Sequence, residues 1–139
     1  MLRSRLALPG LVVALACGSP TDPSEAPRLE FSHRVLFGVA TQPVAAIGGD
    51  GVIRLSAVFQ TPRSGYTLLA VLTVEQARSL NIVVQAVQTM TGFPFPTQNY
   101  YEGTIRGLTE GDYELTVVHF LRDSPPTETT VYRQTITVR

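Results

Sequence analysis

The side chains best able to support chemistry in this chain are two histidines, eleven acidic residues and one cysteine. His33 and His119 each fall on the more apolar face of an alternating segment, where they could meet as a pair of metal ligands. No third ligand stands at the spacing of a metal site, and partial burial with a backbone carbonyl as partner explains both residues better. The sequence therefore predicts neither a metal nor another cofactor.

Nucleophilic and acid–base catalysis also lack a recognisable arrangement. There is no Gly-x-Ser-x-Gly turn, and the only thiol, Cys17, lies in the N-terminal segment. The acidic residues stand singly on turns and outer faces; Glu110 and Asp112 flank Gly111 in a turn whose own geometry favours them. Gly48-Gly49-Asp50-Gly51 precedes neither a helix nor a lysine, which argues against a phosphate loop. We expect no enzyme, and keep a hydrolase only as a third hypothesis.

The residues best suited to recognition are four aromatics in Thr91-Gly-Phe93-Pro-Phe95-Pro-Thr-Gln-Asn-Tyr100-Tyr101. Aromatic side chains on a connection stiffened by prolines offer a large contact area at low entropic cost. Phe93, Phe95, Tyr100 and Tyr101 are therefore candidates for a loop that binds a protein, peptide or glycan. The alternative is that Phe93 and Phe95 fold back to close the open end of the core, which is the commoner fate of aromatic side chains.

Alternation of apolar and polar residues predicts the elements that position these side chains. From Leu29 onward the period is mostly two, as in half-buried strands whose successive side chains face opposite sides. Thr73-Val-Glu-Gln76 matches a helix capping box, but β-rich runs on both sides favour a hairpin there. Seven strands at short spacing indicate an all-β sandwich or barrel. They are expected at 31–40, 53–60, 66–74, 79–88, 99–106, 112–122 and 129–138.

A strand, a glycine-containing turn and a second strand are predicted in Tyr101-Glu-Gly-Thr-Ile-Arg-Gly-Leu108-Thr-Glu-Gly111-Asp-Tyr113-Glu-Leu-Thr-Val117. This stretch resembles the E–F corner of immunoglobulin-like sandwiches, including fibronectin type III and carboxypeptidase-regulatory-like domains, where a leucine, a turn glycine and a tyrosine follow in this order. The resemblance implies a seven-stranded Greek-key sandwich over residues 29–139. It makes Leu108, Gly111 and Tyr113 a structural corner, with the Tyr113 hydroxyl bonded to backbone upstream. The cysteine pair and core tryptophan of antibody domains are absent.

The N-terminal segment has the features of a secretory signal peptide. Arg3 and Arg5 give a basic start, and residues 6–16 form an uncharged, mostly apolar stretch that ends in small residues. This stretch is too short to cross a bilayer as a helix. A proline-rich segment follows, over 18–27, and has almost nothing to bury, so we expect an extended tether.

Val13-Ala14-Leu15-Ala16-Cys17 resembles a bacterial lipobox. In that family the cysteine receives a diacylglyceryl group, the chain is cut before the cysteine, and the new amine is acylated. The resemblance implies a signal peptide at 1–16, a lipidated Cys17 with its tether at 17–28, and a domain held to a bacterial membrane. Gly18 in place of aspartate implies transfer to the outer membrane in diderm cells.

Two alternatives to lipidation stay open for this segment. An ordinary signal peptidase would cut the same bond and leave Cys17 free, or the segment would be a core helix of a cytosolic protein. A lone exposed thiol is a liability in an oxidising compartment, which favours lipidation.

Composition narrows the class of function. The formal net charge is zero and no basic cluster is present, which argues against a nucleic-acid partner. Hydrophobic residues make up 44% of the chain, which argues against disorder. We expect a non-catalytic binding or structural module of the cell envelope, with its domain in the periplasm or at the cell surface. The alternative is an accessory or inhibitor lipoprotein that docks an exported enzyme through the aromatic loop.

Overall fold

The computed structural model describes residues 26–36 and 42–139, so the predicted signal peptide, Cys17 and most of the tether lie outside the described residues. Within the described ranges there is no helix that could cross a membrane. The same ranges form eight β-strands. Their bounds are β1 (Arg28–Leu36), β2 (Ala45–Gly49), β3 (Val52–Thr61), β4 (Tyr66–Gln76), β5 (Ser79–Gln88), β6 (Thr97–Arg106), β7 (Gly111–Leu121) and β8 (Thr127–Val138).

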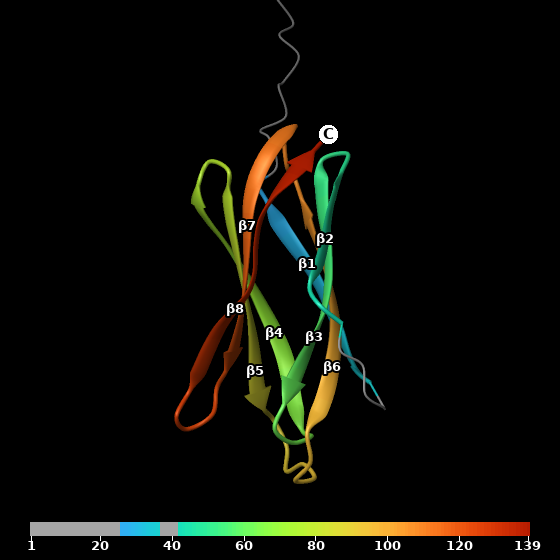
Figure 1. Cartoon of the computed structure of the whole chain (residues 1–139), viewed down its shortest axis with the longest axis vertical. Coiled ribbons are helices and arrows are strands. Elements are labelled where there is room, and N and C mark those ends of the chain that lie inside the picture. The colour runs from blue at the N-terminus through green and yellow to red at the C-terminus, as the bar shows by residue number, and fades with distance from the viewer. Residues whose placement is uncertain (1–25, 37–41) are drawn as a thin grey trace, which may run out of the picture.

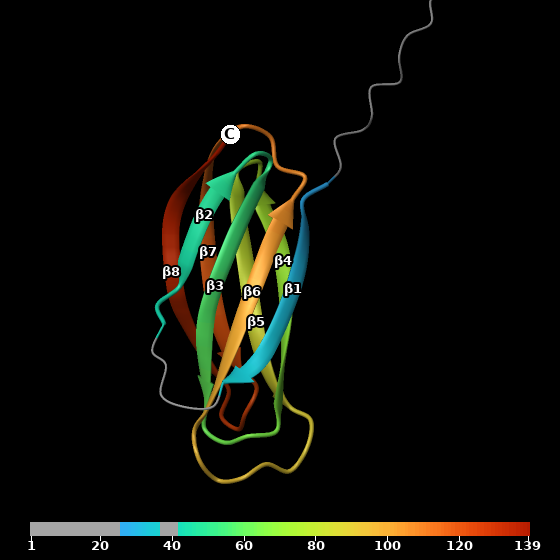
Figure 2. The ribbon, with the colours of Figure 1, turned by 90° about the vertical axis from the view of Figure 1, so that its right-hand side faces the viewer.

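The strands form two four-stranded sheets that pack face to face. Sheet A has the strand order β1-β6-β3-β2, and sheet B has the order β4-β5-β7-β8 (Figures 1 and 2). Alternate side chains of each strand point inward, as the period of two predicts, and together they form one core. The all-β sandwich is therefore confirmed. Fully buried members of the core include Ile53, Ile82, Tyr101, Ile105, Leu115 and Val117.

The prediction of seven strands is wrong by one, because Ala45–Gly49 forms β2 at the edge of sheet A. Alanine and glycine have little strand preference, so this segment gives no local signal. It forms a strand because β3 offers it an antiparallel ladder. Gly48 also lets β8 approach closely, since a Cβ at this position would overlap the Thr137 carbonyl.

One pair of neighbouring strands, β5 and β7, is parallel, whereas the other described pairs are antiparallel. Parallel neighbours need a long crossover connection. Here the chain leaves β5 through residues 89–96, crosses to sheet A as β6, and returns through residues 107–110 to β7. The aromatic segment and the predicted corner are therefore the two ends of a single crossover.

The segment with the helix capping box is a strand that ends in a hairpin. β4 continues to Gln76, and β5 begins at Ser79 after a two-residue turn. The hairpin favoured by the flanking β-rich runs is thus confirmed, and no helix forms there.

The corner between β6 and β7 has the hydrogen bond that the resemblance to immunoglobulin-like corners implies. The Tyr113 hydroxyl accepts a bond of 3.1 Å from the backbone N–H of Thr109, four residues upstream. Leu108 and Tyr113 are both buried. The Arg78 guanidinium lies 5.2 Å from the centre of the Tyr113 ring, and its Nη2 donates to the Glu110 carbonyl. The turn of the β4–β5 hairpin therefore packs on this corner.

Candidate functional site

The β5–β6 loop, residues 89–96, carries the two phenylalanines of the predicted binding loop at the surface. Phe93 is 70% exposed and Phe95 is 55% exposed. Their rings stack with centroids 5.7 Å apart and planes 9° from parallel. Met90, in the same loop, is 67% exposed. These side chains do not close the end of the core, so the fold-back alternative is wrong.

Backbone hydrogen bonds from the β3–β4 turn hold this loop. The backbone N–H of Ser64 donates to the Phe93 carbonyl over 3.2 Å, and the Phe93 N–H donates to the Ser64 Oγ over 2.8 Å. The Gly65 carbonyl accepts from the N–H of Thr89 and of Met90. The loop is therefore pre-organised, which lowers the entropy lost when a partner binds.

The loop lies at the end of the sandwich opposite to the start of β1 (Figures 1 and 2). β6 begins at Thr97, directly after the loop, and ends at Arg106, which pairs with Arg28 at the start of β1. At about 3.3 Å per residue the length of β6 separates the two ends by roughly 30 Å. Phe93 and Phe95 therefore lie at the end of the domain opposite to the one at which the preceding chain joins it.

Tyr101 does not belong to this surface, and its place in the predicted binding loop is corrected. It is fully buried, and its hydroxyl forms a hydrogen bond of 2.9 Å with Nε2 of His119. Phe59 stacks on the His119 ring, with centroids 4.2 Å apart. Burial raises the pKa of Tyr101 and lowers the pKa of His119 to about 4. Tyr101 is inward because β6 begins at Thr97 and pairs on both sides, which fixes the direction of each side chain.

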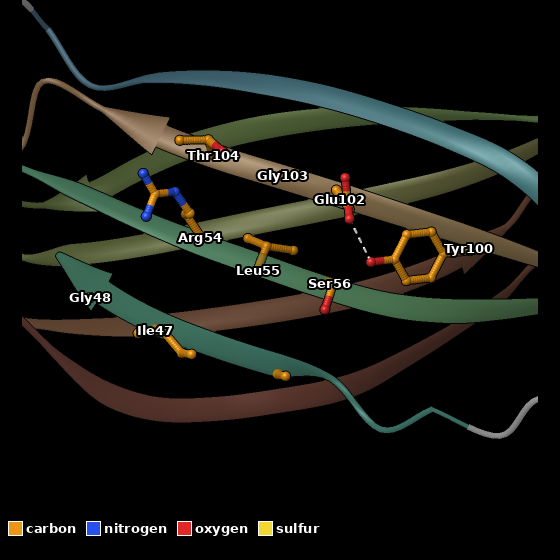
Figure 3. Close-up of a pocket in the computed structure, with 10 residues that line it drawn as sticks. Ile47, Gly48, Arg54, Leu55, Ser56, Tyr100, Glu102, Gly103 and Thr104 are labelled. Carbon is orange, nitrogen blue, oxygen red and sulfur yellow. Dashed lines mark hydrogen bonds between the residues drawn. The ribbon is translucent and has the colours of Figure 1, made fainter.

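Tyr100, the neighbour of Tyr101, points to the opposite side and lines a groove of about 480 Å³ on the outer face of sheet A. Its hydroxyl donates to Glu102 Oε1 over 2.6 Å, and this bond is the main reason that the pKa of Tyr100 is raised. The Arg34 guanidinium lies 5.1 Å from the centre of the same ring. Figure 3 shows Tyr100 and Arg54 at opposite ends of the groove. Tyr100 is thus on a sheet face and not in the loop with Phe93 and Phe95.

The two histidines bind different partners. Nε2 of His33 accepts a long hydrogen bond, 3.4 Å, from the backbone N–H of Leu68 on β4, whereas His119 is bonded to Tyr101. In residues 26–36 and 42–139, no group of three or more His, Cys, Asp or Glu side chains could hold a metal ion.

One polar cluster close to the loop has no counterpart in the sequence analysis. The Tyr66 hydroxyl bonds both carboxylate oxygens of Asp123, at 2.6 and 2.8 Å, and Arg63 Nη2 lies 3.9 Å from the same carboxylate. Burial is the main cause of the raised pKa of Tyr66. The cluster ties the β3–β4 turn to the β7–β8 loop, so it supports the turn that holds Phe93. These residues lie 57 positions apart, and no local pattern could have linked them.

No family model matches the chain, and no curated protein or solved structure matches it. What the site can bind therefore follows from its own geometry.

Proposed function

We propose that the protein is a lipid-anchored, non-catalytic binding module of the bacterial cell envelope, and that the β5–β6 loop is its binding element. The observation that carries this proposal is the exposed, stacked pair of Phe93 and Phe95 on a hydrogen-bonded loop. Exposed apolar patches commonly mark interaction surfaces, and aromatic anchors supply much of the binding free energy at interfaces.

The N-terminal sequence supports the anchor. A lipidated Cys17 would hold the chain at a membrane, and residues 17–28 would lead from it to the start of β1. Because the loop lies at the far end of the domain, this arrangement presents Phe93 and Phe95 away from the bilayer. Gly18 supports the outer membrane as the site of anchoring, with the domain in the periplasm or at the cell surface.

The shape of the loop favours a protein or peptide partner over a glycan. In Figure 2 the loop extends beyond the neighbouring loops at its end of the sandwich. A protruding apolar loop fits a concave groove in a partner, whereas small ligands bind in concave sites of their own receptor. The same observation favours the second candidate function, in which an accessory or inhibitor lipoprotein inserts this loop into the cleft of an exported enzyme.

We also infer a relationship of the domain to immunoglobulin-like Greek-key sandwiches. The bond from Thr109 to Tyr113 supports it, because those folds pin the same corner with a tyrosine hydroxyl. The parallel pairing of β5 with β7 and the additional strand β2 are departures from that pattern. A separate subclass of the sandwich would keep the corner pinned by Tyr113 and still differ in the pairing of β5 with β7 and in the presence of β2.

Affinity capture from the native membranes tests the binding function. The tagged full chain is compared with a Phe93→Ala/Phe95→Ala variant and with Ile47→Ala, a control that alters a side chain 73% exposed on sheet A. We expect one reproducible partner with the wild type and the control, and its loss with the double variant. Equal recovery with all three chains, or no reproducible partner, contradicts the proposal.

Fractionation tests the anchor separately. Replacing Cys17 by serine removes the only thiol, so we expect the protein to move from the membrane fraction to the soluble fraction. Mass spectrometry of the wild-type protein should find fatty chains on a mature N-terminus at Cys17. An intact initiator methionine, or a mature end without fatty chains, contradicts the anchor and leaves the binding test unaffected.

A further inference from the structure

β4 is an open edge of sheet B. In the part of the chain that the structure describes, it forms a ladder with β5 on one side and with no strand on the other. Peptide groups alternate in direction along a strand, so every second residue turns its N–H and C=O to the open side. Leu68 is one of these, because its N–H bonds to the His33 ring and not to β5. Ala70 and Leu72 share its orientation.

Residues 64–74 of this edge lack the charges and prolines that commonly prevent pairing. Natural edge strands are commonly guarded by lysine, proline or inward-pointing charges. The chain contains no lysine, and residues 64–74 include neither a proline nor a charged side chain. Leu69 and Val71 are 54% and 51% exposed on the outer face of β4. Apart from the Leu68 N–H, which donates to the His33 ring, the open side of this stretch offers peptide groups and apolar surface to another strand.

The sequence of the edge is close to a palindrome. Thr67-Leu-Leu-Ala70-Val-Leu-Thr73 has residues of the same kind at equal distances on either side of Ala70. If two copies pair in antiparallel fashion with Ala70 opposite Ala70, each threonine faces a threonine and each aliphatic residue faces an aliphatic residue. Such cross-strand pairs are favourable. The edge is therefore complementary to itself.

We propose that the protein forms a homodimer in which two β4 strands pair in antiparallel fashion about a two-fold axis at Ala70. The two copies of sheet B then form one continuous sheet. A two-fold contact uses the same patch of both copies, which a palindromic strand satisfies. Residues 68, 70 and 72 of the two strands would exchange about six backbone hydrogen bonds. The irregularity in the β4–β5 ladder between Val74 and Gln76 lies outside this stretch.

Two features of the structure are compatible with this pairing. The bond from Leu68 to His33 is long, 3.4 Å, so the Leu68 N–H can exchange it for the Leu72 carbonyl of the second copy. The apolar surface of the outer face continues from Val71 on β4 to Val83, which stands opposite it on β5 and is half-buried. The dimer would place two such apolar faces side by side.

Cysteine cross-linking tests the register. The experiment uses the full chain carrying Cys17→Ser, so that an introduced cysteine is the only thiol. With Ala70→Cys, the introduced cysteines of the two copies would face each other with their Cα atoms about 5.5 Å apart. This distance is within the range of a disulfide, so oxidation should yield a covalent dimer.

Thr67 and Thr73 supply matched controls for that experiment. In the proposed register Thr67 of one copy faces Thr73 of the second copy. The two Thr67 residues lie roughly 20 Å apart, and so do the two Thr73 residues, so neither Thr67→Cys nor Thr73→Cys should cross-link alone. The Thr67→Cys/Thr73→Cys double variant should cross-link. Ala70→Cys that forms no more dimer than the single threonine variants overturns the proposal.

Sedimentation equilibrium tests the association itself in the same Cys17→Ser chain. Val71→Lys places a charge on the paired edge and should raise the dimer Kd by about tenfold or more. Ile47→Lys, a charge on the other sheet, should leave the Kd unchanged. A Cys17→Ser chain that stays monomeric at every concentration, or a dimer that Ile47→Lys disrupts and Val71→Lys does not, overturns the proposal.

Discussion

The two halves of the aromatic segment 91–101 have opposite fates, and Thr97 separates them. Phe93 and Phe95 precede Thr97 and are exposed, whereas Tyr101 follows it and is fully buried. From Thr97 onward the chain belongs to β6, which pairs with β1 and β3, so the strand period sets the side of each residue. Before Thr97 no ladder exists, and contacts with Ser64 set the conformation. Aromatic residues thus serve the core only where the strand turns them inward, as at Tyr101, and lie at the surface in the loop before Thr97.

We therefore expect the buried residues of this segment to contribute to stability and the exposed residues to contribute to binding. Changes at the inward-facing residues of β6 should destabilise the domain, whereas changes in the exposed loop should leave its stability unchanged and remove only its contacts with a partner. Variants of the two halves can therefore test the division directly.

The largest effect is expected for Tyr101→Ala. Removal of a fully buried aromatic side chain leaves a cavity and should lower the free energy of unfolding by about 4 kcal/mol. Tyr100→Ala is the matched control, because its ring lies on the outer face of the same strand; here we expect a loss below about 1 kcal/mol. Urea denaturation measures both. Similar losses in the two variants would refute the division at β6.

The next effect concerns the partner of Tyr101. Burial lowers the pKa of His119 from an ordinary value of 6.5 to about 4. Between these values the unfolded chain binds more protons than the folded chain, so stability is complete above pH 6.5 and falls as the pH drops toward 4. The free energy of unfolding should fall by about 3 kcal/mol between pH 7 and pH 4 because of His119. His119→Gln should remove this pH-dependent loss. Unfolding free energies at pH 7 and near pH 4, in both chains, measure the difference. Equal pH dependence would show that His119 does not titrate in this way.

A smaller effect is expected at the corner, where an aromatic residue is also buried. Tyr113→Phe keeps the ring and deletes the hydrogen bond from Thr109, so it should cost about 1 kcal/mol. Tyr132→Phe is the control, because the bond of its hydroxyl to Gln134 is exposed. Thermal melting should show a shift for Tyr113→Phe only, and an unchanged Tm would mean that this bond does not stabilise the corner.

The smallest effect on stability is expected in the exposed half. Phe93→Ala/Phe95→Ala removes two surface rings and should change the free energy of unfolding by less than about 0.5 kcal/mol. The same variant should lose the partner in affinity capture. A loss of several kcal/mol in urea would instead assign these rings to packing.

The candidate site could be predicted only in part. The composition of residues 91–96 left open whether Phe93 and Phe95 pack on the core or are exposed, and packing is the commoner fate of aromatic residues. The structure leaves both exposed, because prolines there prevent a ladder that would bury alternate residues. The prediction that Tyr101 belongs to the loop is wrong, and the signal for its place in the core is that it shares a strand face with Ile105. The Tyr66–Asp123 contact had no such signal, since its two residues meet only when β4 and the β7–β8 loop come together.

The amino-acid sequence by itself determined the period of two in the longer strands and the hairpin after Gln76, whereas the corner at Tyr113 was expected from a resemblance to immunoglobulin-like sandwiches. These features depend on neighbouring residues, whose side-chain directions and turn preferences act locally. Only the tertiary structure decided that Ala45–Gly49 becomes a strand, that β5 lies parallel to β7 and that β4 is left at an edge. Each of these depends on the pairing of segments that are distant in the sequence. The local alternation of residues carries no information on which distant segments pair.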